Sequence, residues 1–448
     1  MKKKKASGPA QMIGLLREGN VSEFFARARM LEPADLADVL ALADEDERVE
    51  IAKLLPPDLT GEALVAMPDV EHAEDTLAAL TTEQAAEIVG VMPDDDAADI
   101  LGELEPEQQQ RILSAVEPEE RRTVERLLEY DEESAGGLMT GAMVTVNEDE
   151  TVRDALENIR KQAEDVEEFA EVYVVDRNRR LLGILGFKQL VLGAPDRPVR
   201  ELMQEPDVTV GPEMDQEEVA RLMARYNVPS IPVVDRDGRL LGRITFDDVS
   251  DVVEMEATED LLRFGGVSAT EDLGARWFEA VKTRLPWLLV NLVTAFAAGG
   301  VVAYFQSNLS RFIALTVWMP VIAGMGGNTG TQALAVTVRR LALGLISRDD
   351  FRRVITKEIL VGVTNGLAIG AVATTVALLT GMSPMFGLLV FLAMTGNLLV
   401  AGFAGASIPL LLKRFNIDPA IASSIFVTTF TDVCGFALLL GLGGLLLL

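Results

Sequence analysis

Residues 386–411 read FGLLVFLAMTGNLLVAGFAGASIPLL, a run of 26 residues that contains no charged side chain. A transmembrane helix needs about 20 consecutive apolar residues, so this run is long enough to cross a lipid bilayer. Four other apolar stretches of the C-terminal part have a comparable length: residues 285–305, 312–337, 357–380 and 420–447. The sequence therefore predicts an α-helical membrane domain with five spans over residues 276–448.

Basic residues gather in alternate connectors between these spans. They are Lys282, Arg284, Arg339, Arg340, Arg348, Arg352, Arg353, Lys357, Lys413 and Arg414, whereas the opposite connectors hold only Arg311. Because Lys and Arg mark the cytoplasmic side of a membrane protein, the N-terminal part is expected in the cytoplasm and the C-terminus outside. We expect the chain to be a multi-pass protein of a bacterial inner membrane.

The acidic residues are concentrated before the membrane domain. Residues 271–448 hold 8 acids and 12 bases, so the other 61 acids and 28 bases lie in residues 1–270 and give a balance of −33. Such an excess makes the front part repel itself unless cations screen it. It also argues against nucleic acid as a partner, which needs a basic surface. A merely solvated acidic surface is the alternative.

Cysteine and histidine are too rare for several classes of site. The chain has one Cys, Cys434, and one His, His72, which excludes a disulfide framework and a zinc site built from Cys within one chain. No nucleophile–base pair and no phosphate-binding Walker loop is recognisable. We therefore expect a protein that is not an enzyme.

Residues 131–250 contain an internal repeat. Leu138-Met139 recurs as Leu202-Met203, and Val174-Val175-Asp176 recurs as Val233-Val234-Asp235. Each copy predicts an amphipathic helix, at 152–161 and 216–226, followed by two β-rich runs around a turn. This pattern resembles a tandem pair of α/β CBS domains, modules that often bind adenine nucleotides. In the second copy Thr245 and Asp248 match the ribose-binding pattern for ATP; a structural role for this pair is the alternative.

Residues 1–130 show a different recurring unit, in which a proline is followed by acidic and helix-forming residues. It occurs at Pro33, Pro57, Pro68, Pro93, Pro106 and Pro118. Proline at the first helical position with acids behind it marks the start of a helix. The sequence therefore predicts an all-α superhelical N-terminal domain built from successive short helices.

Two features of the spans indicate chemistry inside the membrane. Asp432 lies near the middle of the last span, with Thr428, Thr429 and Thr431 close by. A carboxylate there costs about 2.5–3.5 kcal/mol on insertion scales, so it needs an aqueous path or a partner. The second span carries GMGGNTGTQ over residues 324–332, which suits either a pore lining or close helix packing. For Asp432 an ion site and a helix-pairing acid both remain open.

Clusters of acids precede the membrane domain. Asp95 and Asp99 lie four apart on one helical face, where like charges repel unless a cation or a basic group lies between them. An ordinary solvated surface is the alternative for this pair. Residues 247–260 read DDVSDVVEMEATED and hold seven carboxylates at the start of a connecting helix over residues 251–275. Oxygen-only clusters suit hard cations such as Mg²⁺ or Ca²⁺.

These parts in this order resemble the MgtE family of magnesium transporters along essentially the whole chain. The most specific matches are AGGLMT at 135–140, EATED at 256–260, GMGGNTGTQ, DPA at 418–420, and Asp432 with Val433 and Gly435. The resemblance implies a homodimer with a pore for Mg²⁺ between two copies of Asp432. It also implies that the backbone carbonyl of Thr428 contributes to binding the hydrated ion.

The resemblance further implies regulation by cytosolic Mg²⁺. The connecting helix matches the family's plug, in which Mg²⁺ bridges Glu256, Glu259 and Asp260 to the membrane domain near Asp418. Sensor ions would join the N-terminal domain to the CBS pair, and the matching residues are Glu62, Asp95, Asp99, Gly137, Ala224, Asp248 and Asp251. One position departs from the family, because Asn227 stands where an Asp can occur and offers an oxygen without a charge.

Two other functions remain compatible with the sequence. A membrane-anchored, nucleotide-sensing CBS regulator would use the spans only as an anchor, and a transporter of Mn²⁺, Co²⁺ or Ca²⁺ would use the same pore. An anchor gains nothing from a carboxylate in mid-membrane, which argues against the regulator. The residues do not distinguish a channel from a coupled transporter.

Overall fold

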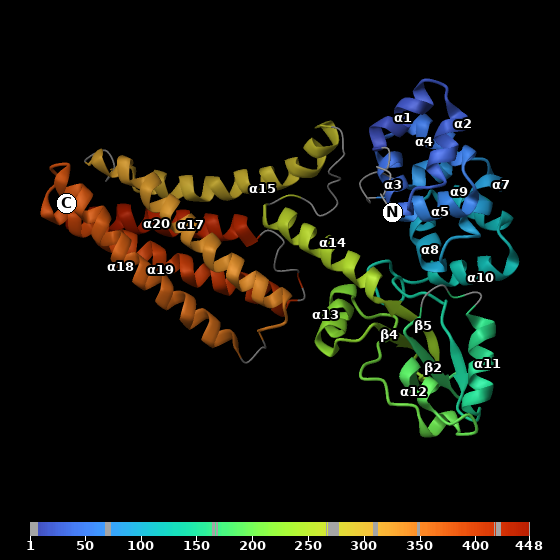
Figure 1. Cartoon of the computed structure of the whole chain (residues 1–448). Coiled ribbons are helices and arrows are strands. Elements are labelled where there is room, and N and C mark those ends of the chain that lie inside the picture. The colour runs from blue at the N-terminus through green and yellow to red at the C-terminus, as the bar shows by residue number, and fades with distance from the viewer. Residues whose placement is uncertain are drawn as a thin grey trace, which may run out of the picture. The chain divides into compact units, whose positions relative to one another are not determined.

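The computed structural model describes residues 8–67, 73–163, 166, 169–265, 267, 277–307, 312–346, 350–415, 417 and 423–447, apart from the side chains of Glu279 and Ser423. The chain forms two compact units, Met1–Met255 and Glu256–Leu448. Figure 1 labels the elements along the chain. Each unit is taken by itself below.

Where the structure describes it, the first part of the N-terminal unit holds ten short helices. They are α1 (Pro9–Arg17), α2 (Val21–Ala28), α3 (Pro33–Leu42), α4 (Glu45–Leu54), α5 (Pro57–Val65), α6 (Ala73–Ala78), α7 (Thr82–Val89), α8 (Asp94–Gly102), α9 (Pro106–Ala115) and α10 (Pro118–Leu127). The pairs in contact include α1 with α3, α3 with α5, α5 with α7, α7 with α9, and α8 with α10. Successive contacts between neighbouring helices of this kind confirm the predicted all-α arrangement.

The predicted proline starts are confirmed at most positions. Pro33, Pro57, Pro106 and Pro118 each open a helix, and Pro93 is the N-cap of α8. Proline suits these positions because the first helical N–H has no partner within the helix. Pro68 and His72 lie outside the described residues.

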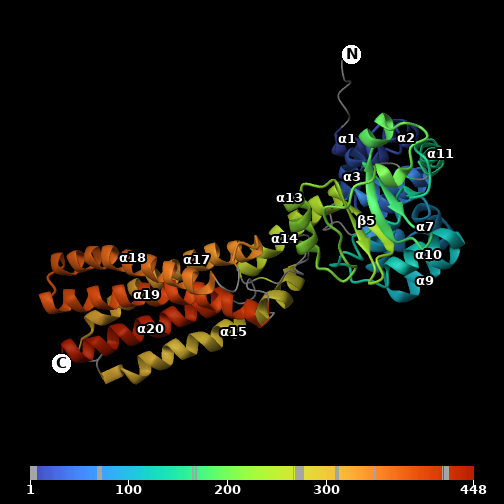
Figure 2. The ribbon, with the colours of Figure 1, turned by 90° about the horizontal axis from the view of Figure 1, so that it is seen from below.

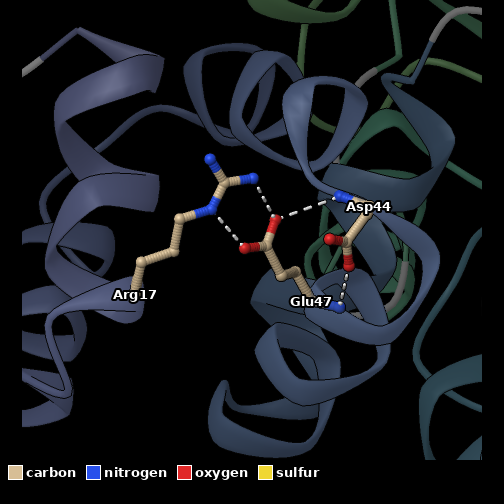
Figure 3. A network of polar contacts seen from close by, with 3 residues as sticks. All are labelled: Arg17, Asp44 and Glu47. Atoms are coloured by element: carbon tan, nitrogen blue, oxygen red, sulfur yellow. Dashed lines mark hydrogen bonds and ion pairs between the residues drawn. The ribbon is translucent and has the colours of Figure 1, made fainter.

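Side-chain caps fix other helix starts. At α4, the Asp44 carboxylate accepts a hydrogen bond from the Glu47 backbone N–H at 2.9 Å, and the Asp44 N–H donates to Glu47 Oε2 at 3.1 Å. Arg17 of α1 donates two bonds to the same Glu47 carboxylate, at 2.6 and 3.0 Å (Figure 3). This capping box therefore also joins α1 to the start of α4.

The two repeats fold alike. In the first, β1 (Thr145–Asn147) runs parallel to β2 (Glu171–Val175), which pairs antiparallel with β3 (Leu181–Gly186). In the second, β4 (Ser230–Val234) pairs antiparallel with β5 (Leu240–Thr245), and an isolated parallel bridge joins Val210 to Val233. The helices α11 (Val152–Gln162) and α13 (Gln216–Tyr226) lie within a residue of their predicted bounds, and α12 (Phe187–Leu192) closes the first copy.

The turns of the repeats also match. Asp176 Oδ1 accepts from the backbone N–H groups of Asn178 and Arg180, and Asp235 Oδ1 accepts from those of Asp237 and Arg239. Arg179 and Gly238 both adopt a positive φ, of 62° and 78°. Between the copies, the Tyr173 hydroxyl bonds the Ser230 hydroxyl at 2.7 Å in a buried position. The predicted CBS pair is therefore confirmed in its details.

The connecting helix α14 (Phe246–Phe264) begins five residues earlier than the predicted range of 251–275. Among its described residues, the membrane unit then holds five long helices: α15 (Trp277–Tyr304), α17 (Ala314–Ala342), α18 (Phe351–Leu379), α19 (Pro384–Arg414) and α20 (Ser423–Leu446). Figure 2 shows α17 to α20 running side by side, and α19 contacts α17, α18 and α20. A buried cluster around Leu389, Met394 and Leu440 forms part of the core of this bundle.

Four of these helices are long and apolar enough to cross a membrane: residues 280–304, 351–379, 384–414 and 424–446. The fifth, α17, has the required length, but its glycines, threonines, Asn328 and Gln332 lower the mean hydropathy of the helix. Composition therefore supports four of the five predicted spans. α17 nevertheless packs against α19 and α20 as part of the same bundle.

Candidate metal sites

The first turn of α8 is the most acidic part of the contact between the helical domain and the CBS pair. Asp94 Oδ1 accepts a hydrogen bond from the Thr140 hydroxyl at 2.5 Å, and Asp94 Oδ2 accepts from the Gly141 N–H at 2.9 Å. A Cβ at Gly141 would lie 2.7 Å from that carboxylate oxygen, so any larger residue here would displace the Asp94 carboxylate. Asp94 therefore ties the two domains together.

The next acids of α8 are held against other carboxylates. Burial, followed by repulsion from Asp96 and Asp248, raises the pKa of Asp95 to about 8. Burial and then the charges of Asp248 and Asp247 raise the pKa of Asp96 to about 7. Burial is again the main cause for Asp99, whose pKa rises to about 7 with Glu132 as the largest charge effect. Because the Asp99 side chain keeps an exposed surface, water weakens its shift and Asp95 is the more strongly perturbed group.

The start of α14 supplies the opposing acids. Asp248 is half-buried, and its pKa is raised chiefly by burial, with a smaller contribution from repulsion by Asp247 and Asp251. The Thr245 N–H donates to Asp248 Oδ2 at 3.2 Å, and the Thr245 hydroxyl donates to the same oxygen. The two predicted ribose-binding residues therefore bond to each other and cap α14 in this structure. Asp251 lies one turn further along the same helix and is exposed.

The remaining predicted sensor residues are more scattered. Gly137 is buried, and a Cβ there would lie 2.6 Å from the carbonyl oxygens of Asp131 and Glu132. Ala224 lies exposed on α13, and Asn227 is the left-handed C-cap of that helix with φ of 52°. Glu62 lies exposed on α5, and no described interaction connects it to the acids of α8. The structure thus brings Asp95, Asp99 and Asp248 together but does not bring Glu62 to them.

The oxygen-only composition of this acidic cluster (Asp95, Asp96, Asp99, Asp248 and Asp251) fits a hard cation. Asp95 Oδ1 is buried without a hydrogen-bond partner in the described parts of the chain, which leaves one lone-pair oxygen available. Within those same parts, no group of three or more His, Cys, Asp or Glu side chains has a geometry ready to hold a metal ion. A hydrated Mg²⁺ does not need such a chelate, because it usually keeps several waters and uses one or two carboxylates.

The second half of α14 carries the predicted plug residues. Glu256, Glu259 and Asp260 are spaced so that they share one face of the helix, and Glu259 forms an ion pair with Arg263. At the end of α14, Phe264 packs with Leu334 and Val338 of α17 and with Val427 of α20. Asp418 lies outside the described residues. The end of α14 therefore contacts the residue next to Thr428.

In the membrane unit, Asp432 and Thr428 lie one helical turn apart on α20. Val427, Thr431 and Gly435 are buried and face α17 or α19, whereas Thr428 is exposed and Asp432 is only half-buried. Asp432 is the tenth residue of the helix, about 14 Å from its start at about 1.5 Å per residue. Among the described residues of one chain, the face that carries Thr428 and Asp432 is therefore only partly covered.

The glycine-rich segment of α17 has two different faces. Gly326 and Gly330 are buried, and a Cβ at Gly330 would lie 2.5 Å from Val427 Cγ1. Asn328 and Gln332 lie on an exposed face, along with Gly324. The two interpretations of this segment thus apply to different residues, since two of the glycines serve helix packing while the amides remain uncovered.

Sequence reasoning missed three contributors to these sites. Asp94 and Asp96 belong to a run of three acids at a helix start, and that run was the available signal. Asn397 of α19 is fully buried against α17 and α20, and no local pattern distinguishes it.

The chain was compared with known families and structures. The description "MgtE intracellular N domain" matches residues 31–133, "CBS domain" matches 135–192 and 199–254, and "Divalent cation transporter" (MgtE) matches 319–442. Magnesium transporter MgtE of Thermus thermophilus is 39% identical over 335 residues, which is 72% of each chain. Magnesium transporter MgtE of Bacillus subtilis is 33% identical over 319 residues, or 71% of each chain.

Two solved structures resemble the N-terminal part. The soluble part of a magnesium transporter is 30% identical with a TM-score of 0.51, and it covers 56% of this chain and 98% of its own. The cytosolic domain of the Mg²⁺ channel MgtE in complex with ATP is 36% identical with a TM-score of 0.51, and it covers 55% of this chain and 99% of its own. The family matches lie in the same order as the parts described above. This chain belongs to the MgtE family of divalent cation transporters.

Proposed function

We propose that this protein carries Mg²⁺ across the bacterial inner membrane along a path beside Asp432. The observation that carries the proposal is the position of Asp432 on a partly exposed face of α20, deep within a transmembrane helix. A carboxylate facing lipid at that depth would be costly, so the face needs water, an ion or another protein surface. Membership of a divalent cation transporter family argues against the alternative of a membrane-anchored regulator.

The partly exposed face supports a homodimer. Two copies related by a two-fold axis would place the same surface of each chain against the other, so two Asp432 carboxylates would face a shared path. The backbone carbonyl of Thr428, one turn earlier, would add an oxygen from each chain. Carboxylates and carbonyls that contact the waters of a hydrated ion suit Mg²⁺, which gives up its water reluctantly.

Regulation by Mg²⁺ follows from the acidic cluster of the N-terminal unit. With little cation, the ionised carboxylates of α8 and α14 repel each other and favour separation of the helical domain from the CBS pair. Bound Mg²⁺ would remove that repulsion, with the buried Asp95 Oδ1 as its first ligand and Asp99, Asp248 and Asp251 close by. Only binding that favours the closed arrangement can shift the equilibrium towards it.

The plug helix would transmit this change to the pore. Glu256, Glu259 and Asp260 would be held by Mg²⁺ near Asp418, while Phe264 rests against Val427 beside Thr428. High cytosolic Mg²⁺ would then close the path from the cytoplasmic side. The basic residues of the connectors support this orientation, with the N-terminus in the cytoplasm and the C-terminus outside.

ATP is a second regulator in this proposal. A structural relative, at 36% identity, was solved in complex with ATP. In this chain Thr245 and Asp248 would hold the ribose, and their mutual hydrogen bond would be exchanged for bonds to the nucleotide. Because Asp248 also belongs to the acidic cluster, ATP and Mg²⁺ binding would be coupled through one residue.

The test is Mg²⁺ uptake into liposomes that contain the purified full chain, with little Mg²⁺ on the cytoplasmic face. We expect uptake by the wild type and a loss of roughly tenfold or more for Asp432→Asn, which keeps the shape of the side chain but removes its charge. Glu358→Gln serves as a matched control, since Glu358 is a buried carboxylate near the start of α18 that pairs with Lys357 at 3.1 Å. Competition by Mn²⁺, Co²⁺ or Ca²⁺ in the same assay tests the choice of ion.

Equal uptake by wild type and Asp432→Asn would contradict a path beside Asp432. No uptake by a folded, correctly oriented wild type would contradict transport altogether.

A further inference from the structure

Asn397 of α19 is a polar side chain with no solvent exposure in the centre of the membrane unit. Its Nδ2 donates a hydrogen bond to the Ile322 carbonyl of α17 at 2.8 Å. This acceptor fixes the orientation of the amide, because the reversed amide would place its oxygen against another oxygen. Asn397 therefore connects α19 to α17 through a bond between a side chain and the backbone.

Glycines of two other helices close around this amide. A Cβ at Gly326 of α17 would lie 2.2 Å from Asn397 Nδ2, and a Cβ at Gly435 of α20 would lie 2.8 Å from the same atom. Real Cβ atoms do not approach so closely, so both positions need glycine while Asn397 is present. Asn397 is thus wedged between the backbones of α17 and α20.

The amide oxygen has a different environment from the amide nitrogen. Asn397 Oδ1 is buried, and no hydrogen-bond partner for it lies among the described residues. A Cβ at Gly435 would lie 3.1 Å from Oδ1, and one at Gly326 would lie 3.3 Å away. The oxygen therefore faces glycine backbone rather than a hydrogen-bond donor, which is an unusual cost for a buried polar group. A leucine would fill much of the same space without that cost, so packing alone does not explain an asparagine here.

The contact lies next to the proposed ion site. Gly435 follows Asp432 by three residues on α20, and the buried residues Val427 and Thr431 of the same helix lie against Gly330. The contacts at 427, 431 and 435, followed by that of Leu438 with Gly396 of α19, help to set the rotation of α20. A change at Asn397 would therefore rotate or shift the segment that carries Asp432.

We propose that Asn397 is a positioning residue for ion permeation, which acts by holding α17 and α20 at the separation and rotation that orient Asp432. This role rests on the proposed function, in which ions pass beside Asp432. Asn397 itself does not contact the ion. Its Nδ2–Ile322 bond fixes α17, and its packing against Gly435 fixes α20.

The first experiment compares Asn397→Leu and Asn397→Asp with wild type by Mg²⁺ uptake into liposomes. For Asn397→Leu we expect a fall of roughly tenfold in maximal rate, since a displacement of about 1 Å of a functional group can cost that much or more. For Asn397→Asp we expect activity that falls relative to wild type as the pH rises from about 6 to about 8, because a protonated carboxyl can donate to the Ile322 carbonyl and an ionised one cannot. That pH profile is a signature that a general packing defect would not produce.

Thr395→Val is the matched control. Thr395 lies two residues away on α19, and its hydroxyl donates to the Gly366 carbonyl of α18 at 3.1 Å, so it bonds on another side of the same helix. We expect its maximal rate and pH profile to match those of wild type. An equal loss in Thr395→Val would overturn the proposal, as would wild-type rate and pH profile in both Asn397 variants.

A second readout does not depend on transport. With Cys434→Ala as background, the rate of modification of Asp432→Cys by a water-soluble thiol reagent reports how position 432 faces the aqueous path. We expect Asn397→Leu to change this rate severalfold and Thr395→Val to leave it unchanged. If Asp432→Asn conducts normally, the proposed path is wrong, yet this labelling still decides whether Asn397 orients α20. If Asn397→Leu does not fold, the same measurements on Asn397→Asp decide.

Discussion

Carboxylates are crowded in the N-terminal unit and sparse in the membrane unit, and the two arrangements suit opposite tasks. On α8 and α14 several acids share one partly buried region, and the pKa of Asp95 reaches about 8 because burial and its neighbours disfavour the charge. On α20 a single acid, Asp432, lies among hydroxyl and small side chains on a partly exposed face. Under the proposed function, crowding would make the first region respond to cation concentration, whereas the isolated acid of the second would hold an ion without trapping it.

The pKa shift of Asp95 gives the approximate free-energy cost of ionising it in this region. One pKa unit corresponds to about 1.4 kcal/mol, so the shift of Asp95 from 3.8 to about 8 opposes burial of its ionised form by on the order of 5 kcal/mol. The acids repel one another, so their individual shifts do not add. Even one such shift is comparable with the lower end of typical domain stabilities of about 5–15 kcal/mol, so we expect protons or cations to influence whether this region stays closed.

The largest expected effect is therefore a pH dependence that Mg²⁺ removes. The folded-state pKa values of Asp95, Asp96 and Asp99 are raised, so their contribution is fully present below the unfolded values near 4. It is lost as the pH rises through about 7 to 8. Without divalent cations, we expect hydrogen exchange at the α8 amides, corrected for its intrinsic rate, to speed up between pH 6 and pH 9.

Saturating Mg²⁺ should suppress that increase, because the cation replaces the protons as the neutralising charge. Amides of α1 and α3, which lie in the same unit but outside the acidic cluster, provide the internal comparison. A rate that does not depend on pH in the absence of cations would mean that these carboxylates are not crowded in solution.

The second effect isolates Asp95. Asp95→Asn keeps the side-chain size and removes the charge, so the closed arrangement should gain about 2–4 kcal/mol without cation and lose most of its response to Mg²⁺. Thermal unfolding of the full chain at pH 8, with and without Mg²⁺, measures both changes. Asp38→Asn, at an exposed carboxylate of α3, should leave the response to Mg²⁺ intact. If both variants lost the response equally, Asp95 would have no special part in it.

The third effect tests the link between the plug and the pore. Phe264→Ala removes an apolar contact with Val427, Leu334 and Val338, which is worth about 1–2 kcal/mol for a partly buried aromatic side chain. The Mg²⁺ concentration needed to close the path should then rise roughly fivefold to tenfold. Leu261→Ala, at a side chain that is 71% exposed on the same helix, is the control. An unchanged closing concentration in Phe264→Ala would show that this contact does not transmit the signal.

Local patterns in the sequence predicted the elements well. Helix α13 has its predicted bounds because an acidic first turn and the left-handed Asn227 mark both ends, and the prolines of the helical domain mark helix starts for the same local reason. The span helices followed from apolar length. Helix α17 is the predicted span that composition does not support, because its glycines and amides reduce its hydropathy although the helix packs within the bundle.

Contacts between distant residues could not be predicted in the same way. Asp94 bonds Thr140 across 46 positions, and Asn397 bonds Ile322 across 75. The local sequence around neither residue predicts its bonding partner, because the pairing depends on how whole helices pack. Spacing singled out Asp95 and Asp99, and the acidic run 247–260 singled out Asp248, but only the family resemblance predicted that they come together; their role as metal ligands remains a prediction.

The smallest effect concerns Asn227, which ends α13 in a left-handed conformation with φ of 52°. Asn227→Asp places a carboxylate at the same point, and Asp tolerates this conformation nearly as well as Asn, so stability should change by less than about 0.5 kcal/mol. If this position contributes an oxygen to a regulatory ion, the added charge should lower the Mg²⁺ concentration at half-closure about twofold to threefold. Asn227→Gly keeps the backbone conformation and removes the side-chain oxygen, so it should shift half-closure in the opposite direction. Uptake measured over a Mg²⁺ series decides this, because identical midpoints in all three proteins would place Asn227 outside the regulatory site and leave it only the task of ending a helix.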